Sequence, residues 1–419
     1  MDVNVSQTDT LVSMMIALVH ELLTMRGGAE RMLRVVADMF PDAPIYTLLY
    51  DEKKLGAWFP KERVRTSSVQ NIAACWPLPA ARFNHHLHLR KFPQAVEQWP
   101  FDSAQGDTDF DLVISFSSAF AHGIKTRGMT KHLCYVHTPA RYLWDQTFDV
   151  LDRAERGFLG SLKRRYLEGT FHKLRQWDAR TSERPDKILA ASKAVQRRIE
   201  LYWRRESEVL YPPVDIAAFP LFEGKREDYF VIASTLVAYK RIELAIEACN
   251  KGKKKLKIVG EGPHRKALEK IAGPTIEFLG YKEHSELVSL LQRASAFLFP
   301  GEEDFGIAPV EAMACGTPVI AYRGGGALET VLEGKTGEFF SEPNADSLLQ
   351  ILQKFACGPK HDLSTDLSSE ASAKEEASAK AEVRRFEQKS YSNNLCAEHA
   401  KNFSQKDFLK NLSEIIRRM

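Results

Sequence analysis

Two glutamates stand eight positions apart in a stretch rich in glycine and proline, FPGEEDFGIAPVEAMACGTPVIAY, which runs from Phe299 to Tyr322. Glu303 falls in a loop, and Glu311 falls in the first turn of a helix that we expect to begin near Pro309, since proline is tolerated as a first helical residue. Two carboxylates placed in this way can face one ligand from two sides. They would accept hydrogen bonds from paired hydroxyl groups.

The start of that helix offers a second kind of chemistry. The N–H groups of Gly306 and Ile307 would point out of the helix N-terminus, where they could hold an anion or a sugar hydroxyl. The loop would follow an apolar strand over 296–299. It would therefore lie at the carboxyl end of a strand, which is where open α/β sheets bind ligands.

The elements that must position these residues follow from short apolar runs that alternate with helical patterns. Gly27 and Gly28 separate the first run from the first helical pattern, which predicts a strand, a glycine turn and a helix. The expected strands are residues 14–19, 45–49, 112–115, 133–136 and 188–191, and then 229–233, 256–259, 276–279, 296–299 and 319–322. Buried strands that alternate with helices indicate parallel sheets covered on both faces.

The prolines at 212 and 213 interrupt this alternation and predict a linker between two doubly wound α/β domains in tandem. The expected segments are a polar extension over 1–13, an N-terminal Rossmann-like domain over 14–211, a C-terminal Rossmann-like domain over 212–360, a spacer rich in Ser, Ala, Glu and Lys over 361–394, and a helix over 395–419 that packs back near the N-terminal domain.

Composition and charge exclude several classes of protein. Lys and Arg total 58 against 55 for Asp and Glu, and a net charge of +3 is too small for a protein that neutralises many nucleic-acid phosphates. The six cysteines form no CxxC pair, which argues against a zinc or redox site. The short apolar N-terminal stretch is interrupted by His20 and Glu21 and is not typical of a signal peptide. We expect a cytoplasmic protein whose contact with the inner face of the cell membrane is peripheral at most.

The stretch from Phe299 to Tyr322, together with GGGALET directly after Arg323, resembles the signature of the family 4 glycosyltransferases. In that family two glutamates separated by seven residues precede a GTPVI strand. The resemblance covers about residues 14–340 and the final helix. It implies retaining enzymes of the GT-B fold, in which two Rossmann-like domains, one on the acceptor side and one for the nucleotide-sugar donor, face a central cleft.

Other segments carry the resemblance in the same order along the chain. The segment YVHTP over 135–139 looks like that of bacterial polysaccharide mannosyltransferases, and STLVAYKR over 234–241 resembles the phosphate-binding turn of the family, although Thr235 stands where an arginine is usual. The implied catalytic residues are His137, Lys240 and Glu303. The implied donor-binding residues are Gly27, Gly28, Arg241, Gly262, Tyr281, Gly306, Ile307 and Glu311.

The function implied by the resemblance is transfer of a hexosyl group, with mannosyl favoured, from a nucleotide diphosphate sugar such as GDP-mannose. The acceptor would be a glycan or lipid-linked oligosaccharide in the synthesis of surface polysaccharide such as O-antigen. No metal or other cofactor is implied, because Lys240, glycine-loop amides and helix N-termini would neutralise the leaving diphosphate. Two alternatives remain, a nucleotide-sugar epimerase of the same fold and a degenerate subunit that binds a nucleotide sugar or a partner without turnover, which Thr235 favours.

The segment from Phe158 to Trp177 mixes basic and aromatic residues on an expected helix. Such a composition is typical of a segment that meets anionic lipid at a membrane surface. A charged helix face that packs beside a core is the alternative.

Overall fold

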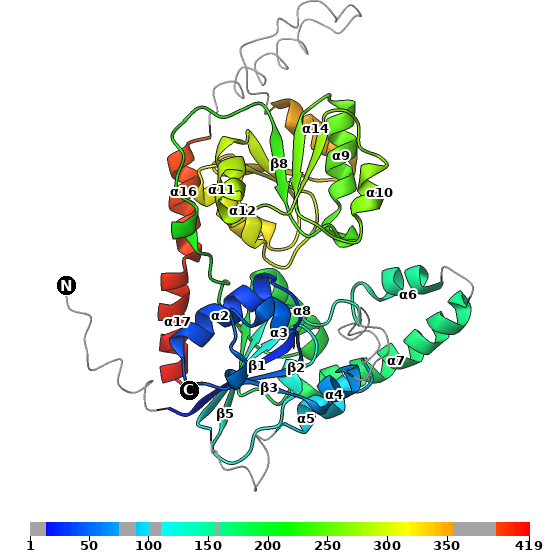
Figure 1. Ribbon diagram of the computed structural model, residues 1–419, viewed down its shortest axis with the longest axis vertical. Helices are drawn as coiled ribbons and strands as arrows, with labels where there is room; N and C mark the ends of the chain where they lie inside the picture. Colours follow the sequence, from blue (N-terminus) through cyan, green and yellow to red (C-terminus); the bar gives the residue numbers. More distant parts are fainter. Residues whose placement is uncertain (1–13, 75–88, 100–109, 156–158, 355–390) are drawn as a thin grey trace, which may run out of the picture. The chain divides into compact units, whose positions relative to one another are not determined.

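The computed structural model describes residues 14–74, 89–99, 110–155, 159–354 and 391–419 (Figure 1). The chain forms two compact units, the first ending at Pro213 and also including Lys406–Met419, and the second spanning Val214–Gln405. The unit boundary therefore falls two residues beyond the predicted one. The predicted polar extension and most of the predicted spacer lie outside the described residues.

Unit 1 is built on a sheet of seven parallel strands in the order β3-β2-β1-β4-β5-β6-β7. The strands are β1 Ile16–Leu23, β2 Ile45–Tyr50, β3 Val64–Thr66, β4 Leu112–Ser117, β5 Lys131–Val136, β6 Lys187–Ala190 and β7 Glu208–Val209. The direction of strand order reverses between β1 and β4. In a doubly wound sheet, the carboxyl ends of the strands on either side of such a reversal border a binding crevice.

Both faces of this sheet are buried, which explains why its central strands are mostly apolar. Along β1, Ile16 and Leu18 face one apolar core, while Ala17 and Val19 face the other. The helices of unit 1 are α2 Gly28–Met39, α3 Glu52–Leu55, α4 Ser68–Ala74, α5 Phe92–Glu97, α6 Thr147–Glu155, α7 Gly160–Thr181, α8 Lys193–Trp203 and α17 Gln405–Arg417.

The described residues of unit 2 form a sheet of six parallel strands in the order β10-β9-β8-β11-β12-β13, with its reversal between β8 and β11. The strands are β8 Phe230–Ala233, β9 Leu256–Val259, β10 Ile276–Gly280, β11 Ala296–Phe299, β12 Val319–Tyr322 and β13 Gly337–Phe340. The helices are α9 Ile242–Lys251, α10 Arg265–Glu269, α11 His284–Arg293, α12 Ile307–Ala314, α13 Ala327–Thr330, α14 Ala345–Lys354 and α16 Asn393–Ala400.

The C-terminal segment differs from the single helix predicted over 395–419. It consists of α16, which packs on α12 of unit 2, a 3₁₀ turn, and α17. Ser404 has extended backbone angles of −68° and 150°, and this interrupts the helix. The spacing of Phe408, Leu412 and Ile415 gives α17 one apolar face, which packs in the core of unit 1.

Candidate functional site

Lys240 and Glu303, both predicted from the sequence, are in direct contact in unit 2. Lys240 ends a 3₁₀ turn that follows β8, and Glu303 lies in the loop between β11 and α12. These two strands are neighbours at the reversal of the sheet, so both loops lie at the same carboxyl edge. The ammonium of Lys240 forms an ion pair with the Glu303 carboxylate, and the side chains are 16% and 17% exposed. The structure thus brings together a cation and a carboxylate at the expected edge.

The loop that carries Glu303 is fixed by the glycine-rich turn after β12. Gly326 donates its N–H to the carbonyl oxygen of Glu303 at 2.8 Å. This hydrogen bond joins two segments that the sequence analysis treated as one signature. It holds the backbone of Glu303 in place while its side chain reaches Lys240.

Helix α12 begins at Ile307, two residues earlier than the predicted start near Pro309. Gly306 is the N-cap, with a φ of 92°, a left-handed conformation that favours glycine. Pro309 is tolerated because the first-turn N–H groups have no partner within the helix. Glu311 is consequently the fifth helical residue, in the second turn instead of the predicted first, and it is buried. The amides of Gly306 and Ile307 do lie at the start of the helix, as expected.

The other predicted donor-binding residues of unit 2 have different surroundings. A Cβ at Gly262 would lie 2.3 Å from the carbonyl oxygen of Leu236, so this glycine is required for close packing of its own chain. Tyr281 is 73% exposed. Arg241 donates from Nε to the Glu243 carboxylate at 2.8 Å, so its guanidinium is engaged at the start of α9. Thr235, which follows β8, is exposed.

In unit 1, Gly27 and Gly28 lie at the start of α2, as predicted, but an acidic side chain already faces that helix end. Glu30 accepts a hydrogen bond from the N–H of Gly27 at 2.9 Å. Burial raises the pKa of Glu30 to about 7. Glu30 was not predicted as a site residue, although a glutamate three positions after an N-cap is a capping-box signal.

His137 follows β5 and packs beside the rings of Tyr135 and Phe116, at centroid distances of 5.2 and 6.4 Å. Its Nε2 atom is buried and has no hydrogen-bond partner among the described residues. Burial lowers the pKa of His137 to about 4, so the imidazole is neutral at pH 7. A neutral imidazole can both donate and accept a hydrogen bond.

A second histidine, His20 on β1, was missed as a site residue. Its ring centroid lies 6.5 Å from that of His137, and the residue is only 5% exposed. Neither ring nitrogen makes a geometrically complete hydrogen bond with a described residue. Burial and then His137 lower the pKa of His20 to about 3, and the backbone of Leu22 offsets them only in part. Two adjacent polar residues, His20 and Glu21, inside an apolar strand were the available signal.

The segment after His137 is anchored by Asp178 of α7, which is fully buried. Its carboxylate accepts hydrogen bonds from the indole N–H groups of Trp144 at 2.9 Å and Trp203 at 2.7 Å. Burial raises the pKa of Asp178 to about 7. These contacts tie the loop that carries His137 and Trp144 to two helices, and they give that loop a fixed course.

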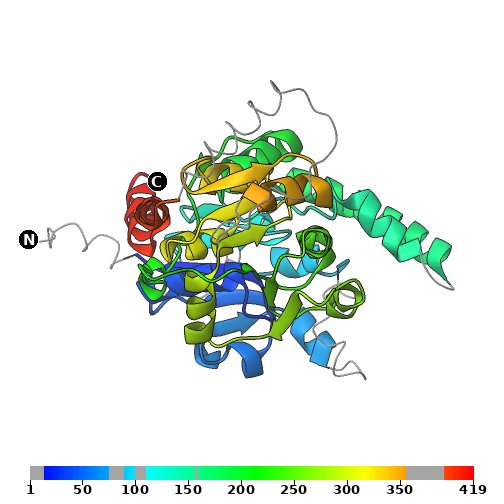
Figure 2. The ribbon, with the colours of Figure 1, turned by 90° about the horizontal axis from the view of Figure 1, so that it is seen from above.

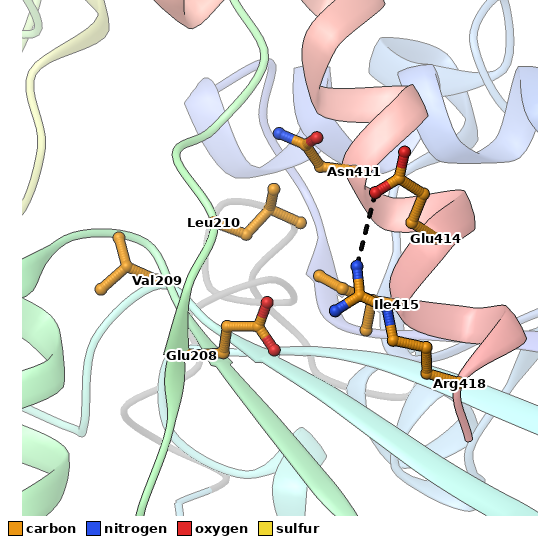
Figure 3. A pocket seen from close by; sticks show the side chains of 7 residues that line it. All are labelled: Glu208, Val209, Leu210, Asn411, Glu414, Ile415 and Arg418. Carbon is orange, nitrogen blue, oxygen red and sulfur yellow. Dashed lines mark hydrogen bonds and ion pairs between the residues drawn. The ribbon is translucent and has the colours of Figure 1, made fainter.

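A small pocket in unit 1 lies elsewhere, between β7 and α17 (Figure 3). It is lined by Glu208, Val209, Leu210, Asn411, Glu414, Ile415 and Arg418. Glu414 and Arg418 form an ion pair across one turn of α17 at 3.4 Å. No predicted site residue lines this pocket, and it is not part of the candidate site.

Within the described parts of the chain, no three His, Cys, Asp or Glu side chains are grouped to hold a metal ion. In the same residues, no helix combines the length and the apolar composition that crossing a membrane requires.

The fold is shared with solved glycosyltransferase structures. The structure of HepE from Anabaena in complex with UDP aligns with a TM-score of 0.62, covering 96% of this chain and 100% of that one at 15% sequence identity. At this identity the likeness shows the fold alone. The two parallel-sheet units are those of the GT-B fold, which confirms the predicted fold class.

Residues 215–373 match the family described as Glycosyl transferases group 1. The chain is 32% identical over 152 residues to a GDP-mannose-dependent alpha-(1-6)-phosphatidylinositol monomannoside mannosyltransferase of Mycolicibacterium smegmatis, covering 31% of this chain and 39% of the relative. It is 27% identical over 209 residues to the alpha-1,3/1,6-mannosyltransferase ALG2 of Homo sapiens, covering 42% and 50%.

These matches span half or less of the curated relatives. The predicted resemblance to GT-B glycosyltransferases, with mannosyltransferases among the relatives, is confirmed. The roles of the individual site residues stay predictions.

Proposed function

We propose that this protein is a retaining glycosyltransferase of family 4 that moves a hexosyl group from a nucleotide diphosphate sugar to a glycan or lipid-linked oligosaccharide. The observation that carries the proposal is the contact between Lys240 and Glu303 at the carboxyl edge of the unit 2 sheet. A cation and a carboxylate at one point suit a donor with an anionic diphosphate next to a hydroxyl-rich ring.

In this proposal the ion pair opens when the donor binds. The ammonium of Lys240 turns to the diphosphate and offsets the charge that develops as the nucleotide leaves. Glu303 would then accept hydrogen bonds from hydroxyls of the sugar, and Glu311 would accept from the ribose. The amides of Gly306 and Ile307 at the start of α12 would add donors for phosphate oxygens.

In unit 1, we assign His137 to a hydroxyl of the transferred sugar. Its neutral imidazole and buried, unpartnered Nε2 suit a neutral ligand better than an anion or a metal ion. We name no protein base, because the leaving phosphate would take the proton of the acceptor. The amides at Gly27 and Gly28 would meet the diphosphate only if Glu30 is protonated or turned away, since its carboxylate faces the Gly27 N–H.

We favour mannose as the sugar because two relatives are named as mannosyltransferases. We favour surface polysaccharide as the pathway because residues 135–139 resemble a segment of bacterial polysaccharide mannosyltransferases. The HepE structure holds UDP instead, so the identity of the nucleotide base in the donor of this chain must be tested directly. A lipid-linked acceptor would bring the reaction to a membrane surface.

A second function, binding of a nucleotide sugar without turnover, is favoured by one observation. Thr235 stands in the position of the usual arginine, and the nearby Arg241 is engaged by Glu243. The phosphate clamp would then consist of Lys240 alone, without the bidentate contact that an arginine provides.

One experiment separates these functions. The full chain is incubated with GDP-mannose, UDP-glucose or dTDP-glucose, with and without a lipid-linked oligosaccharide acceptor, after a thermal-shift screen of the same donors. A ligand at 100 times its dissociation constant adds about 2.7 kcal/mol of stability. Glycosylated acceptor supports transfer, an epimerised donor without acceptor indicates an epimerase, and stabilisation without turnover indicates a binding subunit.

The site assignment is tested by Glu303→Gln and His137→Ala, each of which should lower turnover at least tenfold. Glu302→Gln, on the exposed neighbour in the same loop, is the matched control and should leave turnover within twofold. Normal turnover in both site variants would refute the assignment.

A further inference from the structure

Helices α6 and α7 form a hairpin whose far end extends beyond the rest of unit 1, as both views show (Figures 1 and 2). The second half of α7 packs in a core of the unit through Phe171, Leu174 and Trp177. Residues 161–169 are different. All of them are exposed except Arg164 and Leu167, which are half-buried.

Large apolar side chains line the outer side of this extension. Leu159, Leu162 and Tyr166 are 63%, 67% and 51% exposed. The guanidinium of Arg90 lies over the Tyr166 ring, 3.9 Å from its centroid, so the remaining exposed part of Tyr166 borders a further cation. Their spacing of three and then four residues places them on one side of a helix. We call these three residues, together with Lys163 and Arg165 that flank them, the outer stripe of α7. Apolar side chains that gather on one exposed side, instead of being scattered singly, mark an interaction surface.

The charges of the hairpin are sorted to opposite sides. One guanidinium, that of Arg164, binds all three nearby carboxylates, with Asp152 at 2.8 Å, Glu155 at 2.5 Å and Glu168 at 3.0 Å. These contacts raise the pKa of Arg164 further above its usual range. The acidic groups are therefore held on the side of α7 that faces α6.

The two cations of the outer stripe have no such partners. Among the described residues, no carboxylate lies within ion-pair distance of Lys163 or Arg165, and both side chains are exposed. The outer stripe thus combines apolar contact groups with free positive charge and carries no acid. Its partner must be negatively charged and able to accept apolar side chains.

We propose that the outer stripe of α7 docks on the headgroup region of an anionic lipid bilayer. Leu159, Leu162 and Tyr166 would enter the boundary between headgroups and acyl chains, and Lys163 and Arg165 would meet lipid phosphates. A second copy of the chain is a poorer occupant, because a stable dimer needs about 800 Å² on each partner and three side chains on one ridge fall well short of that. The inference rests on the side chains of α7 and does not depend on the proposed transfer.

The structure corrects the surface predicted from the sequence over 158–177. Phe171 and Trp177 belong to the core, and Arg164 belongs to the hairpin. A substitution of Arg164 would therefore disturb the hairpin and would be a misleading test of lipid binding.

The test is sedimentation of the full chain with vesicles of phosphatidylcholine alone or mixed equally with phosphatidylglycerol. Wild type should pellet with the anionic vesicles, and less so at high salt. Lys163→Ser with Arg165→Ser should weaken the partition coefficient about thirtyfold at low salt, from about 1 kcal/mol for each cation near the surface. Leu162→Ser with Tyr166→Ser should weaken it at both salt concentrations.

The matched controls are Arg127→Ser with Lys131→Ser, and Leu201→Ser, which change exposed residues elsewhere in unit 1 and should bind as wild type does. Circular dichroism confirms that each variant is folded. Equal pelleting of wild type and both stripe variants would overturn the proposal. So would a dimer in sedimentation equilibrium that Leu162→Ser with Tyr166→Ser abolishes, because the stripe would then bind a second copy.

Transfer to a soluble acceptor is measured in parallel. It should be unchanged in the stripe variants. Vesicle binding by a chain without transfer activity would leave this inference intact and count only against the proposed function.

Discussion

Replacing His20 by leucine should make unit 1 more stable. The imidazole is buried, and neither of its nitrogens makes a complete hydrogen bond with a described residue. Leucine is of similar size and brings no polar atom, so the substitution removes a desolvation cost and gives up only the incomplete interaction of the imidazole with the Leu22 backbone. A core substitution that stabilises a protein is unusual, since most substitutions at buried positions destabilise.

The expected magnitude depends on pH. At pH 7.5 the histidine is neutral in both states, and the gain is the cost of a buried, unsatisfied polar group, about 1–3 kcal/mol. Below pH 6.5 the unfolded chain binds a proton that the folded chain refuses, because the folded pKa of His20 is about 3. Wild type then loses about 1.4 kcal/mol per pH unit. At pH 5 the advantage of the leucine variant should have grown by about 2 kcal/mol.

Urea unfolding followed by tryptophan fluorescence measures the difference in the free energy of unfolding of unit 1 between wild type and the leucine variant. All six tryptophans lie before residue 214, so the signal reports on the segment that forms unit 1. His172→Leu, which replaces an exposed histidine on α7, is the matched control and should show no comparable gain.

Two results would refute the reasoning. Destabilisation by His20→Leu at pH 7.5 would mean that the imidazole makes stabilising hydrogen bonds in solution. An equal difference at pH 7.5 and pH 5 would mean that its pKa is not lowered by burial.

Three further predictions concern other parts of the molecule. Gly262→Ala should lower the stability of unit 2 by about 1–3 kcal/mol, because the new Cβ would lie 2.3 Å from the Leu236 oxygen. Hydrogen exchange of the β8 and β9 amides should therefore be faster than in wild type, and unchanged or slower exchange would contradict this. Thr235→Arg should tighten donor binding about tenfold in calorimetry by adding a bidentate phosphate contact, and weaker binding would show that another cation occupies that place. Arg164→Met should speed hydrogen exchange in α6, since Asp152 and Glu155 lose their partner. Exchange in β1 should stay unchanged. Wild-type protection of the α6 amides would mean that the ion pairs do not stabilise the hairpin.

The sequence was sufficient to predict most of the strands. Three predicted ranges, Leu256–Val259, Ala296–Phe299 and Val319–Tyr322, coincide with β9, β11 and β12. The reason is physical: both faces of a parallel sheet are buried, so a central strand is mostly apolar, and Lys257 is the one charged residue in these three ranges. The paired prolines likewise predicted the division into two units to within two residues.

The strands that the sequence analysis missed are β3, β7 and β13, and each lies at an edge of its sheet. These strands are short, and Arg65, Glu208 and Glu338 interrupt their apolar pattern. An edge strand pairs on one side only and tolerates such residues, so its sequence differs little from that of a loop.

The contacts of the candidate site were decided by the tertiary structure. The family resemblance implied roles for Lys240 and Glu303, but only the strand order, which makes β8 and β11 neighbours, brings their side chains together. The pairing of His20 with His137 has the same origin, since β1 and β5 both flank β4.

The charges of α7 show the same limit. The sequence predicted a helix that mixes basic and aromatic residues over 158–177, without showing which charges are paired. The hairpin with α6 turns Arg164 inward to three carboxylates and leaves Lys163 and Arg165 outside. A sequence fixes which charges exist and how they are spaced along one helix. The partner that neutralises a charge depends on the element packed beside it, and that is set by the fold.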